Sequence, residues 1–185
     1  MGQANTAPRL ENGQPALQSC RLPMEDFRKG VSSPVATNRN GVAGYLFTAP
    51  AEILYVQFCI PTNWDGENNF DLVIHCVLDA DETANDLIDW ETSVISIADH
   101  ENVDTAGVQT PGVNHDIGAV NTIGSFHMVT VVLDYDDATC PINYGDNVSI
   151  VLSRTANVGA AGYVAGVIVI DICIGYIMNR LGEPV

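Results

Sequence analysis

Residues 164–177 read VAGVIVIDICIGYI and are the most informative stretch of the chain. Side chains alternate between the two faces of a β-strand, so this stretch presents two sets of residues. The set from Val164 to Tyr176 is apolar enough for a core, and the set from Ala165 to Ile177 is mostly apolar too. An antiparallel strand that is apolar on both faces must be covered on its outer side. The cover would be the chain's own N-terminal segment or another subunit, and we expect an oligomer interface formed by Val167, Val169, Asp171, Cys173 and Ile177.

Asp171 stands in the middle of that apolar face. Burying an unpaired carboxylate costs several kcal/mol, so Asp171 is expected to reach water, accept hydrogen bonds or pair with an arginine. Arg154 and Arg180 are the only arginines in the body of the chain, residues 45–185.

Seven further runs rich in Val, Ile, Tyr and Phe are separated by clusters of Gly, Pro, Asn and Asp, a pattern typical of strands and turns. The runs are Val42–Thr48, Glu52–Ile60, Phe70–Leu78, Trp90–Ala98, a weaker one at Ala106–Thr110, Phe126–Tyr135 and Asp146–Arg154. About eight antiparallel strands within roughly 140 residues predict an all-β jelly-roll β-sandwich. Helix should be minor, with a turn or two at Asp81–Asp89.

Residues 1–41 contain four prolines and no sustained apolar period, which predicts an extended N-terminal arm before a jelly-roll domain at residues 42–185. Residues 1–44 carry five basic and three acidic residues, or +2, whereas residues 45–185 carry two basic and 20 acidic residues, or −18. We expect the arm to be disordered in the free protein, to dock on an acidic partner, and to be dispensable for folding of the body. Its expected contact residues are Arg9, Leu10, Leu17, Arg21, Leu22, Phe27, Arg28, Lys29 and Arg39.

The net charge of −16 argues against binding to nucleic acid or to anionic membranes. We expect no secretory signal and no membrane span. The five cysteines include no close-spaced pair, so we interpret them as reduced, buried small hydrophobic residues.

Motifs of the common hydrolases, metalloproteases and phosphate-binding enzymes are absent, so no enzymatic activity and no cofactor is expected. His100 and His115 could meet in space, and acidic clusters at 79–82 and 134–137 could bind calcium, but the motifs are weak and we predict no metal site. Trp64, with Asp65 beside it, is a candidate ligand-binding residue that could stack on a sugar. The preferred interpretation is that Trp64 and Trp90 plug the ends of the sandwich.

The segment GDNVSIVLSR, residues 145–154, followed by VIVIDICIGY, residues 167–176, resembles the closing strands of small jelly-roll proteins in tailed-phage virions. These proteins are trimeric capsid decoration (cement) proteins or fibre tips. The resemblance is one of pattern and lies within the C-terminal third of the chain. It implies a structural protein on the capsid surface of a virion, made in the host cytoplasm, commonly a homotrimer, with the major capsid protein or other virion subunits as partners. A receptor- or carbohydrate-binding jelly-roll domain of a phage fibre is the alternative.

Overall fold

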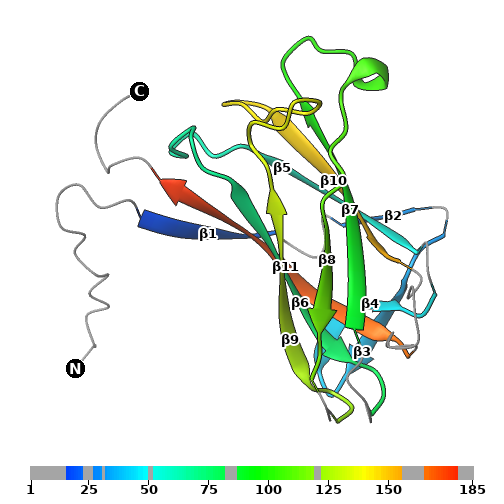
Figure 1. The fold of residues 1–185 in the computed structure, drawn as a ribbon. Helices are drawn as coiled ribbons and strands as arrows, with labels where there is room; N and C mark the ends of the chain where they lie inside the picture. Colours follow the sequence, from blue (N-terminus) through cyan, green and yellow to red (C-terminus); the bar gives the residue numbers. More distant parts are fainter. Residues whose placement is uncertain are drawn as a thin grey trace.

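The computed structural model describes residues 16–22, 27–30, 32–49, 52–81, 87–118, 122–155 and 165–178. Within them the chain forms two antiparallel sheets packed face to face (Figure 1). Helical structure in these ranges is limited to the 3-10 turn Val103–Thr105. No helix among the described residues is long and apolar enough to cross a membrane.

Sheet A has the strand order β3-β4-β11-β6-β9, and β1 pairs with the second half of β11. Its strands are β1 (Ala16–Leu22), β3 (Val35–Arg39), β4 (Val42–Phe47), β6 (Phe70–Leu78), β9 (Phe126–Leu133) and β11 (Val167–Met178). Sheet B has the order β2-β5-β10-β7-β8. Its strands are β2 (Arg28–Lys29), β5 (Ile53–Cys59), β7 (Leu87–Ile97), β8 (Gly112–Asp116) and β10 (Asn147–Arg154).

The order of strands β4 to β11 is that of a jelly roll. Counted along the chain, the first, eighth, third and sixth of them lie side by side in sheet A, and the second, seventh, fourth and fifth lie side by side in sheet B. Successive strands therefore alternate between the sheets except for β7 and β8, which are neighbours in sheet B, as in the two Greek keys of a jelly roll. The predicted jelly-roll fold is confirmed.

Seven of the eight predicted strands are present with small shifts at their ends. The weak run Ala106–Thr110 is wrong as a strand, because the eighth strand is β8 at Gly112–Asp116 and the run contributes one bridge, from Gln109 to Val94. The helical turn expected at Asp81–Asp89 lies partly outside the described residues, and Leu87–Asp89 belong to β7.

A β-bulge in β11 changes which side chains face the core. Val169 pairs with Cys76 on β6, but the next pair is Asp171 with His75, so Ile170 is an extra residue. Val167 and Val169 consequently point into the core and are fully buried, together with Ile172 beyond the bulge. The expected placement of Val167 and Val169 on the outer face is wrong.

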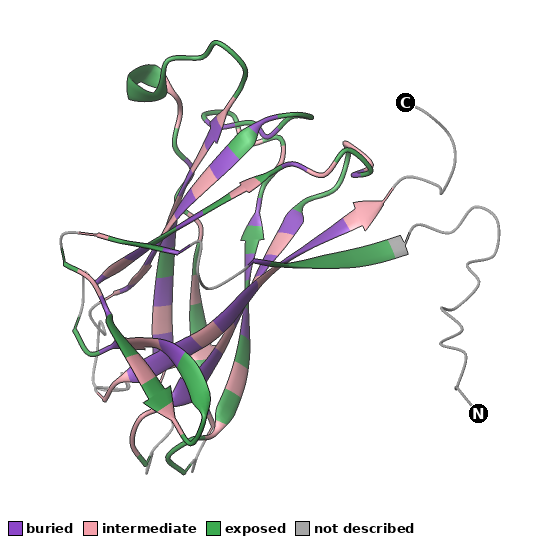
Figure 2. Cartoon of the chain, turned by 180° about the vertical axis from the view of Figure 1, so that it is seen from behind, coloured by how far each residue is buried: buried purple, intermediate pink, exposed green. Residues whose placement is uncertain are grey.

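The described part of residues 1–41 belongs to the sandwich. β1 pairs with β11, β2 with β5, and β3 with β4. Leu22 and Phe27 are buried in the core, whereas most of β1 is exposed (Figure 2). The expectation that these two side chains fill pockets on a partner is wrong, and removing the segment would remove core side chains. Arg9 and Leu10 lie outside the described residues.

Candidate functional site

The outer face of sheet A carries a cluster of four polar side chains, which we name the Asp171 cluster: Arg21, His75, Asp171 and Cys173. His75 lies directly opposite Asp171 in the β6–β11 register, and Cys173 follows two residues later on the same face of β11. His75 Nδ1 donates to Asp171 Oδ2 over 3.3 Å, and Cys173 Sγ lies 3.7 Å from the same oxygen. One carboxylate oxygen therefore lies next to both a ring nitrogen and a sulfur.

Arg21 of β1 occupies the other carboxylate oxygen. Its Nε donates to Asp171 Oδ1 over 2.8 Å, and the arginine side chain is largely exposed while the carboxylate is mostly buried. Asp171 thus pairs with an arginine as expected, but the partner comes from the N-terminal segment. Arg154 is buried elsewhere and donates to the Ala165 carbonyl over 2.5 Å, and Arg180 lies outside the described residues.

The surroundings of Cys173 disfavour the thiolate form of its side chain. Partial burial raises its pKa, and the negative charge of Asp171 raises it further. The cluster does not resemble an activated nucleophile, because the carboxylate stands between the thiol and the imidazole.

Exposed apolar side chains flank this cluster along the edge strand β9. Phe126, Met128 and Val132 are 53%, 60% and 50% exposed, and we name these three residues the β9 stripe. The Phe126 ring lies 5.6 Å from the His75 ring, so the stripe and the cluster are contiguous. Leu17 of β1, 74% exposed, adds an apolar side chain beside Ile177 at the opposite side of this face.

The outer face of β11 therefore contains only some of the residues predicted for the oligomer interface. Asp171, Cys173 and Ile177 remain on it, and the exposed apolar residues on β9 and β1 take the place assigned to Val167 and Val169.

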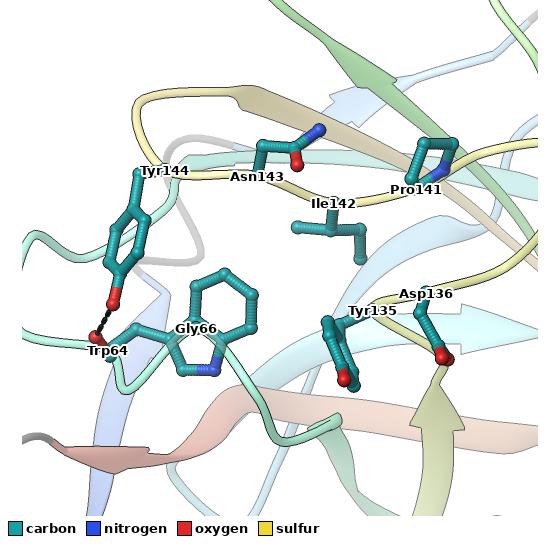
Figure 3. Close-up of a pocket in the computed structure, with 8 residues that line it drawn as sticks. All are labelled: Trp64, Gly66, Tyr135, Asp136, Pro141, Ile142, Asn143 and Tyr144. Atoms are coloured by element: carbon teal, nitrogen blue, oxygen red, sulfur yellow. Dashed lines mark hydrogen bonds between the residues drawn. The ribbon is translucent and has the colours of Figure 1, made fainter.

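A second candidate site is a hollow of about 350 Å³ at the end of the sandwich that carries Trp64 (Figure 3). Tyr135, Asn143 and Tyr144 line it together with Gly66, Asp136, Pro141 and Ile142. Tyr144 is exposed and donates from its hydroxyl to the Trp64 carbonyl over 2.5 Å. Its ring is therefore fixed in orientation at the rim of the hollow.

Trp64 itself is only 1% exposed, so it cannot offer a ring face for stacking. It packs on Phe70 with ring centroids 4.7 Å apart, and its Nε1 donates to the Asn68 carbonyl over 2.9 Å. The Asp65 carboxylate accepts hydrogen bonds from the backbone of Glu67 and Asn68 and so holds the loop. The interpretation of Trp64 as a plug is confirmed, and its assignment as a stacking residue is wrong.

Trp90 is buried as well, and it packs edge-on against Phe47 with ring centroids 5.2 Å apart. Its interpretation as a plug within the sandwich is also confirmed.

His115 pairs with His127 rather than with His100, the partner considered from the sequence. His100 is exposed beside Asp99, so the meeting of His100 with His115 is wrong. His115 on β8 instead lies 3.3 Å from His127 on β9, measured from Nε2 to Nδ1, and joins the edges of the two sheets. Partial burial lowers the pKa of both, and the charge of His115 lowers that of His127 further.

The two acidic clusters are committed to local structure. Asp79 forms an ion pair with Arg39, and Asp81 accepts from the backbone of Ile123. Asp137 accepts from the hydroxyl of Thr139 and from the backbone of Thr139 and Cys140, and these hydrogen bonds lower its pKa. These contacts match acids that stabilise turns.

The described cysteines are all free, but only Cys76 and Cys140 are buried. Burial raises the pKa of Cys76 to about 12. Cys20 and Cys59 are exposed, so the expectation of burial is wrong for these two.

No protein-family model and no curated protein matches the sequence. Among solved structures, a xylan-binding module is similar at 9% identity and a TM-score of 0.49, covering 89% of this chain and 100% of that one. A bacteriophage CBA120 tailspike domain matches at 13% identity and a TM-score of 0.38, over 87% of this chain and 19% of that one. A chain of infectious bursal disease virus, Gx strain, matches at 13% identity and a TM-score of 0.39, over 100% of this chain and 39% of that one. The jelly-roll assignment rests on the strand order, and this fold fits both carbohydrate-binding and viral proteins.

Proposed function

We propose that this chain is a structural protein of a virion that decorates the capsid as a homotrimer and acts through surface contacts without catalysis. The observation that carries the proposal is the β9 stripe, which lies on the same face of sheet A as the exposed Leu17 of β1. Its residues are apolar, lie on an edge strand of sheet A, and are about half exposed or more.

The stripe has enough apolar surface to drive association. Fully burying a large apolar side chain is worth about 1.5–3 kcal/mol relative to exposure, so completing the burial of three half-exposed side chains contributes about 3 kcal/mol per subunit. Large apolar side chains that are exposed together on one strand face, as Phe126 and Met128 are, mark an interaction surface.

We assign the stripe to contacts between copies, and attachment to the capsid to the opposite edge of the sandwich. Arg28 and Lys29 lie exposed on β2, which is one edge strand of sheet B. The other edge strand is β8, which contacts β9 of sheet A. Arg21 and Arg39 are paired within the chain with Asp171 and Asp79. Among the described arm cations, Arg28 and Lys29 are therefore the two exposed ones that form no ion pair within the chain, and Lys29 Nζ lies 5.5 Å from the centre of the Tyr45 ring.

Light scattering of the purified chain at micromolar concentration tests the association. A mass three times that of one chain is expected, and a monomer would overturn the trimer. Electron microscopy of the parent particle then tests the location, because a decoration protein occupies lattice positions on the shell whereas a fibre tip does not.

Attachment to the particle should weaken when salt is raised from about 0.05 to 1 M, since exposed charge pairs are screened at high salt. The loss should be modest, because Arg21 and Arg39 are already paired within the chain, which leaves Arg28 and Lys29 among the described arm cations for a partner. Dissociation that does not change with salt would contradict an electrostatic attachment.

Carbohydrate binding by a fibre domain is the second candidate function, and the hollow in Figure 3 favours it specifically. An exposed tyrosine ring next to amide and carboxylate groups can stack on a sugar and bind its hydroxyl groups. Titration with a panel of oligosaccharides tests this function. Binding that Tyr144→Ala abolishes and Tyr55→Ala leaves intact would support it.

A further inference from the structure

Three side chains of the Asp171 cluster offer donor atoms of three kinds at one place. One ring nitrogen of His75, one carboxylate oxygen of Asp171 and Cys173 Sγ all lie within 4.8 Å of one another. We propose that these three residues form a binding site for a divalent transition metal of borderline softness, with Zn²⁺ as the best match. Nitrogen, carboxylate oxygen and thiolate sulfur are the ligand atoms that zinc accepts in proteins.

The distances suit tetrahedral coordination. With bonds of about 2.0–2.1 Å to nitrogen, 2.0–2.2 Å to oxygen and 2.3 Å to sulfur, two ligands at the tetrahedral angle stand about 3.4 Å apart for nitrogen and oxygen, and about 3.6 Å apart for sulfur and oxygen. The structure has 3.3 Å between His75 Nδ1 and Asp171 Oδ2, and 3.7 Å between Cys173 Sγ and the same oxygen. Two edges of the coordination polyhedron are thus already at their required lengths.

The backbone holds these donors in place. β6 and β11 are neighbouring strands inside sheet A, and their register sets His75 opposite Asp171. The bulge at Ile170 is what turns Asp171 outward, because uninterrupted alternation after the core residue Val169 would direct residue 171 inward. The bulge therefore places the carboxylate on the same face as Cys173.

Arg21 supports the site from outside. It holds Asp171 Oδ1, which leaves Oδ2 for the other two donors and fixes the plane of the carboxylate. Hydrogen bonds of this kind to metal-binding carboxylates orient them. With three protein donors on a partly exposed face, the fourth position would be open to water or to a donor from a neighbouring subunit.

The inference goes beyond the proposed function and can be tested on the isolated chain of residues 1–185. Apo protein is titrated with Co²⁺ alone, whose thiolate complexes have a charge-transfer band in the near ultraviolet, and the bound Co²⁺ is then displaced with Zn²⁺. About one equivalent should bind, with spectra of tetrahedral coordination including a thiolate.

Matched variants separate this site from other thiols and imidazoles. Cys173→Ser should abolish the charge-transfer band, and both Cys173→Ser and His75→Gln should weaken binding about 100-fold or more. Cys20→Ser, Cys59→Ser and His100→Gln change exposed residues of the same types and should leave binding within about twofold of the wild type. Circular dichroism of each variant verifies that the sandwich is intact.

Failure to bind Co²⁺ and Zn²⁺ at micromolar concentration would overturn the proposal. So would binding that survives Cys173→Ser in a folded protein, or that is lost in the exposed-cysteine variants instead. If the Asp171 cluster is only a hydrogen-bonded ion pair, all variants and the wild type will bind metal equally poorly. None of these results depends on whether the chain forms trimers.

Discussion

The outer faces of the two sheets differ in the side chains that they expose. Sheet A exposes the β9 stripe and Leu17 around the Asp171 cluster. On the outer face of sheet B, Ser149 on β10 lies opposite Gln57 on β5 and accepts a hydrogen bond from its side chain, and the half-buried Val151 lies opposite the exposed Tyr55. Both sheets bury one apolar face in the same core, so the chemistry of the second face decides which sheet can associate.

The inward position of Val169 gives the largest expected effect. Val169→Asp would place a carboxylate in the core of sheet A, so the free energy of unfolding should fall by about 4 kcal/mol or more. Val151→Asp makes the same change on the outer face of sheet B, where Val151 is half-buried, and should cost about 1 kcal/mol. Urea denaturation measures both. A folded, monomeric Val169→Asp protein would mean that Val169 lies on the outer face after all.

The β9 stripe gives the next largest effect. The double variant Phe126→Asp with Met128→Asp should weaken the oligomer by about 3 kcal/mol per subunit, since two apolar contacts are replaced by repelling charges. Light scattering as a function of concentration measures the change.

Tyr55→Asp is the control on sheet B, because Tyr55 is the large apolar residue exposed on its outer face. Equal weakening by the control would remove the distinction between the two faces.

Strand β1, which has seven residues, contributes one leucine to the core and another to the outer face. The two leucines therefore allow the effect of burial to be compared within a single strand. Leu22→Ala should lower the free energy of unfolding by about 2 kcal/mol, because Leu22 packs in the core opposite Ile172. Leu17→Ala should change it by less than about 0.5 kcal/mol, because Leu17 is exposed. Equal values for the two leucines would indicate that β1 detaches from the sandwich in solution.

The His115–His127 pair, where the edges of the two sheets meet, gives the smallest effect. Their lowered pKa values mean that the folded state takes up fewer protons than the unfolded state once the pH falls below about 6.5. The contribution to stability is therefore complete above about pH 6.5 and is lost as the pH falls through the lowered pKa values. The loss should stay below about 1 kcal/mol, since both rings are partly exposed.

Denaturation between pH 7 and 5 measures that loss, and His127→Gln should flatten the pH dependence. If the free energy of unfolding rises on acidification in the wild type but not in the variant, the pKa values of the two histidines are raised by folding rather than lowered.

The local sequence pattern was sufficient to predict all but one of the strands from β4 to β11, and insufficient to predict β8. Strand β6 alternates buried and half-buried residues from Phe70 to Cys76, and that period is visible in the sequence. β8 reads GVNHD with a single large apolar residue, Val113, so its alternation carries no hydrophobic signal. Its pairing with β7 is what makes it a strand.

The Asp171 cluster shows why site residues were harder to predict. Asp171 and Cys173 could be placed on one face of their strand from spacing alone. His75 and Arg21 join them through the registers of β6 and β1 with β11, which connect residues 96 and 150 positions apart. Such registers depend on how whole strands pack, so they cannot be predicted from the sequence near Asp171.

The sequence by itself determined the all-β class, the jelly roll and the buried position of Trp64 and Trp90, because period-two alternation and turn residues act over a few neighbouring positions. Only the tertiary structure decided that β11 reverses its faces at Ile170, that the N-terminal segment completes both sheets, and that Arg21 rather than Arg154 pairs with Asp171. A bulge shifts every later side chain to the opposite face at the cost of one unpaired residue, so its position follows from the fit of β11 between β4, β1 and β6 rather than from local preference.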